Sequence, residues 1–284
     1  MKRILACIDA SAYATSVVEL TTWAAGRLSA SVELLHVVQR KDAVAARHDL
    51  SGAIGLGVKS ELLEELTRID EAEGKLAIER GRILLNETAR RLTEAGIAEV
   101  RKLHRHGGIL ETIIEREAEA DLVVIGKRGS SSQFAKEHIG SEIERVVRAS
   151  IKPVLIVSSK IREPRTVVVA FDGSAAASKA LGFVASSPLF EGLAVHLVVA
   201  GPDDATHRGR LEQAAARMSD RAPAPVKFLG QGAADKVIAD YMAGRPDGLL
   251  VMGAYGHSPL RALIVGSTTT AMVRTVHVPV LLVR

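Results

Sequence analysis

Two glycine motifs in this sequence have residue types and spacing that suit the binding of a phosphate group. In the C-terminal part of the chain, Gly253 and Gly256 are followed, after nine residues, by Gly266-Ser267-Thr268-Thr269. That motif opens a helical pattern, and the free N–H groups and dipole at a helix start attract an anion. In the alternative reading the glycines are only turns and Ser267 is only a helix N-cap. The hydroxyl cluster, the aspartate that accompanies the motif and the recurrence of the motif in the chain together favour the polyphosphate site.

A similar motif in the middle of the chain lacks part of this chemistry. Gly126 and Gly129 are followed, after ten residues, by Gly140-Ser141-Glu142-Ile143, so Glu and Ile stand where the other copy has two threonines. A carboxylate repels a phosphate, and isoleucine has no hydroxyl group to donate. We therefore expect this copy to bind a phosphate ligand weakly or not at all, or to bind something else. Lys127 and Arg128, between the first two glycines, are expected to be solvated loop residues.

Each motif has an aspartate to accompany it, at the end of the first strand of its half of the chain. These residues are Asp9 in Cys-Ile-Asp-Ala-Ser and Asp172 in Ala-Phe-Asp-Gly-Ser. In open parallel sheets, ligands bind at the carboxyl ends of the strands, where the second-strand ends Val37 and Ala200 also fall. Asp172 is placed to accept a hydrogen bond from a sugar hydroxyl or to help hold a metal bound to phosphate.

The elements that must position these residues are short aliphatic runs alternating with helical patterns. Runs rich in Val, Ile and Leu without strict alternation are typical of parallel strands buried on both faces. We expect helices near Ser11, over about 75–95 and 108–119, and from Ser141. The expected strands are 2–8, 32–38, 99–104, 121–125 and 153–157 in the first half, and 166–171, 194–200, 225–229, 248–252 and 279–283 in the second.

These elements recur, so the sequence predicts two tandem α/β domains, 1–160 and 165–284. Each is a five-stranded parallel sheet flanked by helices. The offset between matching residues falls from 163 (Asp9 to Asp172) to 126 (Pro153 to Pro279), so the first half carries extra material, placed at about 40–75. That segment is expected to cover the first site or to serve as an interface.

Composition excludes several classes of function. The chain of 284 residues has a net charge of +4, one cysteine and only 3% aromatic residues. Few aromatic side chains and the lack of a long Lys/Arg block argue against nucleic-acid binding. The histidines and the single cysteine offer no metal-binding set from the protein alone. The sequence has no signal peptide and no membrane span, so we expect a cytoplasmic protein.

The whole pattern resembles the universal stress protein family, in a tandem arrangement. The features that carry the resemblance are Gly-x2-Gly-x9-Gly-Ser after a strand, Asp172-Gly-Ser174 after the first strand of its half, and Leu34-Leu35-His36-Val37. The resemblance covers nearly the whole chain, twice. It implies a Rossmann-like fold similar to that of the adenine nucleotide alpha hydrolases. It also implies a bound adenine nucleotide, ATP, ADP or AMP, with Mg²⁺ accompanying ATP near Asp172.

By that resemblance, each part of the nucleotide has expected contacts in the second half. The adenine would meet the backbone at Ala200, and the ribose would lie near Asp172 and Gly253. The phosphates would lie over Gly256, Gly266, Ser267, Thr268 and Thr269. The apolar part of the pocket would be lined by Ala170, Phe171 and Met252. The weaker candidates of the first half are Asp9, Val37, Gly126, Gly129, Gly140 and Ser141.

Taken with these features, the resemblance implies an ATP-binding stress-response regulatory protein that acts as a switch on an unidentified protein through its second domain. No nucleophile–base arrangement follows from the spacing, and the Lys-Ser/Thr pair of a P-loop is missing, so at most slow ATP hydrolysis is expected. The alternatives are a protein-interaction scaffold that binds no nucleotide, and a weak ATPase. The last strand, Val278–Val283, is expected to pair either internally with Pro153–Val157 or with another subunit, giving an internal pseudo-dimer or a homodimer.

Overall fold

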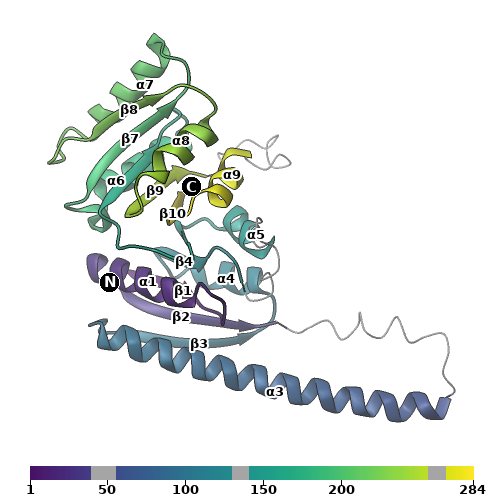
Figure 1. Cartoon of the computed structure of the whole chain (residues 1–284). Helices are drawn as coiled ribbons and strands as arrows, with labels where there is room; N and C mark the ends of the chain where they lie inside the picture. Colours follow the sequence, from purple (N-terminus) through teal and green to yellow (C-terminus); the bar gives the residue numbers. More distant parts are fainter. Residues whose placement is uncertain (40–55, 130–140, 255–266) are drawn as a thin grey trace.

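The computed structural model describes residues 1–39, 56–129, 141–254 and 267–284, with the side chains of 56–63, 70, 141, 267 and 268 left out. In the first half, helices alternate with strands as the aliphatic runs predict (Figure 1). The order is β1 (Arg3–Cys7), α1 (Ala14–Leu28), β2 (Ser31–Val38), α3 (Leu56–Glu94), β3 (Val100–His106), α4 (Ile109–Glu117), β4 (Leu122–Gly126), α5 (Ser141–Ala149) and β5 (Val154–Val157).

The second half repeats this alternation. A short 3-10 turn, η2 (Pro188–Phe190), follows its first helix. The other elements are β6 (Thr166–Ala170), α6 (Ala175–Ser186), β7 (Ala194–Ala200), α7 (Ala205–Ala216), β8 (Val226–Gly230), α8 (Ala234–Ala243), β9 (Gly248–Gly253), α9 (Ser267–Thr275) and β10 (Val280–Val283).

The two halves join in one sheet of ten strands, in the order β3-β2-β1-β4-β5-β10-β9-β6-β7-β8. Pairing is parallel inside each half, and β5 and β10 meet antiparallel, with Leu155 opposite Leu281. Of the two pairings expected for the last strand, the structure therefore shows the internal one. The order on one side of this junction mirrors the order on the other, as a pseudo-twofold axis between the halves requires.

Helices cover both faces of the sheet, because side chains alternate along each strand. In β1, Ile4 and Ala6 belong to the core that contains residues of α1, α3, α6 and α7, whereas Leu5 belongs to the core that contains residues of α4, α5, α8 and α9. The second core matters for the sites, because it holds the two helices that begin with the glycine-serine motifs. Ile143 of α5 and Met272 of α9 are both buried in it.

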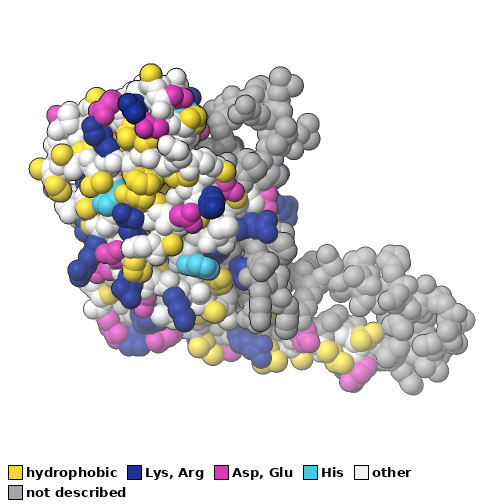
Figure 2. Space-filling view, turned by 45° about the horizontal axis from the view of Figure 1, so that its top comes forward, with side chains coloured by type: hydrophobic (Ala, Val, Ile, Leu, Met, Phe, Trp, Pro, Cys, Tyr) yellow, Lys and Arg dark blue, Asp and Glu magenta, His cyan; other side chains and the backbone are white. Residues whose placement is uncertain are grey.

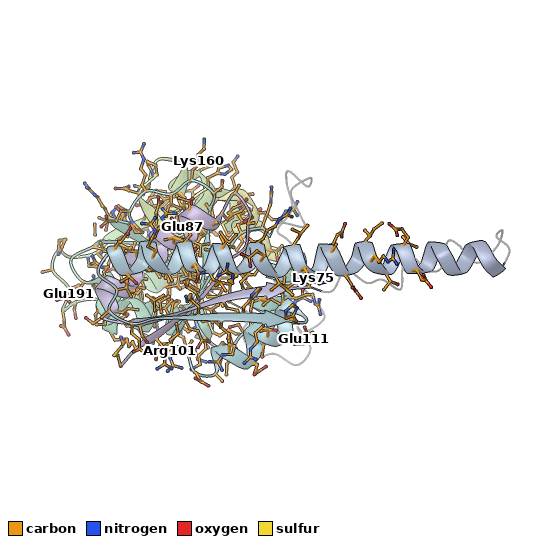
Figure 3. All side chains as sticks on the ribbon, turned by 90° about the horizontal axis from the view of Figure 1, so that it is seen from below. Lys75, Glu87, Arg101, Glu111, Lys160 and Glu191 are labelled. Carbon is orange, nitrogen blue, oxygen red and sulfur yellow. The ribbon has the colours of Figure 1, made fainter. Side chains whose placement is uncertain are left out.

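Helix α3 is far longer than the sequence predicted, since it begins at Leu56 and not near residue 75. Its C-terminal part packs on β3 and β2, with Leu85 and Leu92 buried. Figures 1 and 3 show the part before Lys75 extending beyond the body of the molecule. Within the described residues, the extra segment thus projects beyond the body of the molecule, and residues 40–55 lie outside the described residues. None of the described helices combines the length and apolar character needed to cross a membrane.

Candidate functional site

Three predicted residues of the second half meet at one edge of the sheet. Ala170 ends β6, and the register places it beside Met252 of β9 on one side and Val198 of β7 on the other. Ala200 ends β7 two residues further along. Ala170, Ala200 and Met252 all adjoin the core beneath α8 and α9. Phe171 is 2% exposed but packs in the opposite core, so the structure separates it from the other two lining candidates.

Asp172 lies exposed just beyond β6, where its carboxylate shapes the turn into α6. Its Oδ1 accepts a hydrogen bond from the Ser174 N–H at 2.9 Å, and Ser174 Oγ in turn accepts from the Ala177 N–H at 3.1 Å as the N-cap of α6. This is the side-chain-to-backbone bonding that Asp and Ser favour at such turns. One Asp172 oxygen is thereby engaged, and the exposed carboxylate still faces solvent at the predicted ligand edge.

Arg210 of α7 lies over this turn, a position that the sequence analysis missed. Gly173 has φ of +82°, and a Cβ built on it would lie 3.2 Å from Arg210 Nε. A guanidinium over the Gly173 turn can bind a phosphate in a bidentate manner. No spacing in the sequence connects Arg210 to Gly173, because α7 reaches the turn only through the packing of the fold.

Gly253 is required where the end of β9 meets the start of α6. A Cβ on Gly253 would lie 2.3 Å from Ala176 C and 2.5 Å from Ala177 N, so any side chain there would force the two backbone segments apart. The rest of the motif is described only in part. Gly256 and Gly266 lie outside the described residues. Ser267 and Thr268 begin α9, and Thr269 is 7% exposed.

The first half contains a partly open cavity of about 100 Å³ at the matching place. Four of the weaker candidates, Asp9, Val37, Gly126 and Gly129, line it together. Gly140 lies outside the described residues, and only the backbone of Ser141 is described. The structure thus brings these four first-half candidates together in the lining of one cavity.

This cavity suits a phosphate less well than the second-half motif does, although Arg128 is among its lining residues. Its walls are mainly aliphatic, including Ile8, Leu35 and Ile143. Glu142 also lines it, and that carboxylate is bonded to Arg145 at 2.9 and 3.1 Å in the first turn of α5. A helix start that carries its own carboxylate has its dipole already compensated and repels a further anion. The cavity suits an apolar group.

Lys127 corrects an expectation, because it is not solvated. It is 7% exposed, and its Nζ donates hydrogen bonds to Arg274 O at 2.9 Å and Val276 O at 3.0 Å, both at the C-terminal end of α9. Burial, with a smaller contribution from Arg128, lowers the pKa of Lys127 to about 8. The sequence could not show this, because the second half covers the loop only in the folded chain.

The described residues contain no group of three or more His, Cys, Asp or Glu side chains that could hold a metal. Both candidate sites lie at the carboxyl ends of parallel strands. The protein is a tandem, doubly wound α/β protein whose two halves form mirrored parts of one sheet.

Comparison with known proteins narrows that class. The sequence profile of the universal stress protein family matches residues 1–158 and 197–284. The chain is 33% identical over 290 residues to universal stress protein Slr1230 of Synechocystis sp., with 100% of both chains covered. The chain therefore belongs to the universal stress protein family, a family of stress-response proteins.

Solved structures share the whole fold. A universal stress protein from Archaeoglobus fulgidus DSM 4304 has a TM-score of 0.73 at 20% identity, covering 99% of this chain and 98% of that one. A protein of Pseudomonas aeruginosa PAO1, described as functionally unknown, has a TM-score of 0.68 at 18% identity, covering 100% and 92%. At these identities the likeness shows the fold alone.

Proposed function

We propose that this protein is a regulatory protein that binds an adenine nucleotide in its second half. The observation that supports this best is the shared sheet edge of Ala170, Ala200 and Met252, with Asp172 exposed beside it. Ligands of doubly wound sheets bind at such an edge. The adenine would lie against the Ala200 end of β7, and the ribose would lie near Asp172 and Gly253.

The phosphates would lie where α9 begins. Gly256, Gly266 and the Ser267-Thr268-Thr269 start of the helix supply backbone N–H groups and hydroxyls suited to an anion. Arg210, which lies over Gly173, adds a cation on the α7 side. With ATP, Mg²⁺ would neutralise phosphate charge, and the Asp172 carboxylate is the oxygen ligand that this hard cation prefers. ADP and AMP would use the same contacts with fewer phosphates.

The test is mass spectrometry of the nucleotide released from the purified protein, repeated on two matched variants. Gly266→Glu places a carboxylate in the second-half motif, and Gly140→Glu places the same carboxylate at the matching first-half position. We expect Gly266→Glu to lose the nucleotide and Gly140→Glu to retain it. Loss in Gly140→Glu alone would move the site to the first half and contradict the proposal.

The cavity lined by Asp9 and Val37 supports a second candidate, a separate ligand site in the first half. Its aliphatic walls favour an uncharged ring or short chain over a polyphosphate. A small apolar probe such as toluene should raise the unfolding temperature of the full chain, and Ile143→Trp, which fills the cavity, should abolish that rise. An unchanged unfolding temperature in saturating toluene would exclude this candidate.

In the cell we propose that the nucleotide acts as a switch for an unidentified partner protein in the cytoplasm, with hydrolysis slow at most. Figure 2 shows Lys and Arg interspersed with Asp and Glu on the face in view, which favours a protein partner over a nucleic acid. A switch requires the partner to bind the ATP-bound and empty states with different affinities. Equal affinity of the partner for the ATP-bound and empty states would rule out the switch. The alternative of a protein-interaction scaffold would then remain.

A further inference from the structure

Lys127 extends from the glycine loop of the first half into the second half. Its neighbours Gly126 and Arg128 line the first-half cavity, and the Lys127 N–H is fixed to β5 by a hydrogen bond to Val157 O at 2.8 Å. The side chain itself lies outside that cavity and is buried against the end of α9. The segment Gly126–Gly129, which ends β4 and begins the following loop, thus contacts the cavity and the second half at once.

Lys127 donates to carbonyl groups at the end of α9 that have no hydrogen-bond donor within the helix. The last carbonyls of a helix have no intrahelical partner, and a cation at that end interacts favourably with the dipole. Lys127 Nζ donates to Arg274 O, in the last turn of α9, and to Val276 O just beyond it. The N-terminal end of α9 is Ser267, which belongs to the second-half glycine motif.

Helix α9 is short enough to transmit a displacement. Its 9 residues span about 13 Å at the usual rise per residue. Met272 and Val273 are buried in the shared core, so the helix moves as a packed body if it moves. A shift of its C-terminal end is therefore a shift of the helix start that would face the phosphates.

The second half has no equivalent of the Lys127 side chain at the matching position, Ala254. Ala254 has the same place in the second half, since its N–H bonds to Val283 O at 2.8 Å as that of Lys127 bonds to Val157 O. Alanine has no side chain that could reach α5. The second half instead places Arg284, whose Nη1 donates to Ser150 O at 2.8 Å just beyond α5, but Arg284 is not part of a glycine loop. The coupling thus runs from the first-half loop to the second-half helix.

We propose that Lys127 is a positioning residue for the second-half nucleotide site, through which the state of the first-half glycine loop sets the position of α9. This rests on the proposed function for the nucleotide itself. Whatever moves the Gly126–Gly129 loop, a ligand in the first-half cavity included, would then change the affinity of the other half.

Hydrogen exchange of the full-length protein tests the positioning without any nucleotide. Lys127→Met keeps the length of the side chain and removes the ammonium, and Lys160→Met removes one charge from an exposed position of the link between the halves. We expect the amides of Met272–Val276 to exchange at least about fivefold faster in Lys127→Met and to be unchanged in Lys160→Met. Equal exchange in the two variants would overturn the proposal.

Titration calorimetry with ATP tests the consequence for the site. We expect Lys127→Met to weaken ATP binding about fivefold or more, in the ordinary range of coupling between sites, and Lys127→Arg and Lys160→Met to bind as the wild type does. If Lys127→Met is too unstable to measure, Lys127→Gln makes the same comparison. Unchanged ATP affinity in the Met or Gln variant refutes the coupling. If the wild type does not bind ATP, the proposed function is refuted instead. The hydrogen-exchange result then decides by itself whether Lys127 positions α9.

Discussion

Gly253 lies against Ala176, backbone to backbone. A Cβ on Gly253 would lie 2.3 Å from Ala176 C, so the end of β9 and the N-terminal turn of α6 are closer than any side chain allows. In the first half the matching contact is between Gly126 and Tyr13, where a Cβ would lie 2.8 Å from Tyr13 Cβ. The close approach recurs, but only the second half makes it through the backbone of a helix start.

The first prediction concerns this contact. Gly253→Ala should lower the free energy of unfolding by about 1–3 kcal/mol, because backbone atoms must separate to admit the methyl group. It should also abolish ATP binding if the proposed site is correct. The control is Gly182→Ala in α6, where an added Cβ has no neighbour within 4 Å, so the better helix former should cost nothing. Denaturant unfolding and titration calorimetry of both variants check this, and an unaffected Gly253→Ala would contradict it.

The second prediction compares two glycines of α3, seven residues apart. A Cβ on Gly81 would lie 2.5 Å from His36 Cδ2 and 2.6 Å from His104 Nε2, whereas a Cβ on Gly74 would meet nothing within 4 Å. Gly81→Ala should destabilise the fold by about 1–3 kcal/mol, and Gly74→Ala should stabilise it by up to about 1 kcal/mol through helix propensity. Urea unfolding measures both changes. The same sign for both would show that α3 does not pack as described.

The third prediction follows from the buried ammonium of Lys127. Its pKa is lowered from 10.5 to about 8, so between these values the unfolded chain binds more protons than the folded chain. The contribution of Lys127 to the free energy of unfolding therefore rises as the pH goes from about 8 to 10.5. The stability difference between wild type and Lys127→Met should rise by roughly 1–3 kcal/mol over that window. Lys160→Met should show no such change relative to wild type.

The fourth prediction concerns His104, beneath α3. Burial lowers its pKa from 6.5, with further lowering by His36 and His106, and its Nε2 is buried without a hydrogen-bond partner among the described residues. The unfolded state then binds more protons just below pH 6.5, so stability falls as the pH drops through that value. His104→Gln should flatten this fall in thermal unfolding between pH 7 and 5. The same change at the exposed His277 should leave it as steep as in the wild type.

The strands could be predicted from the sequence because burial on both faces leaves an aliphatic signature. All ten expected runs are strands within a residue or two, as with 194–200, which matches Ala194–Ala200. The start of α3 was missed because Gly57 and Gly74 weaken the helical pattern, and because the described side chains before Lys75 are exposed, so no buried face there imposes a periodicity. The internal pairing of β10 with β5 remained one of two alternatives, since strand chemistry alone does not name a partner.

The site was predictable only where it lies close to a motif in the chain. Asp172 and Gly253 follow recognisable strands, so their common sheet edge could be expected. Arg210 and the burial of Lys127 could not, because both depend on which helix packs over which turn. The first-half cavity was likewise invisible in a sequence whose Glu142 and Ile143 signalled only the loss of phosphate chemistry.

The antiparallel meeting of β5 and β10 has a consequence for how such a protein can evolve. In a symmetric assembly of two identical chains, every substitution appears in both sites. Here the same mirrored sheet is made from one polypeptide, so Glu142 can replace a hydroxyl residue on one side while Thr268 persists on the other. Covalent duplication thereby permits a division of labour between sites that share one continuous scaffold and are present in a fixed one-to-one ratio at any concentration.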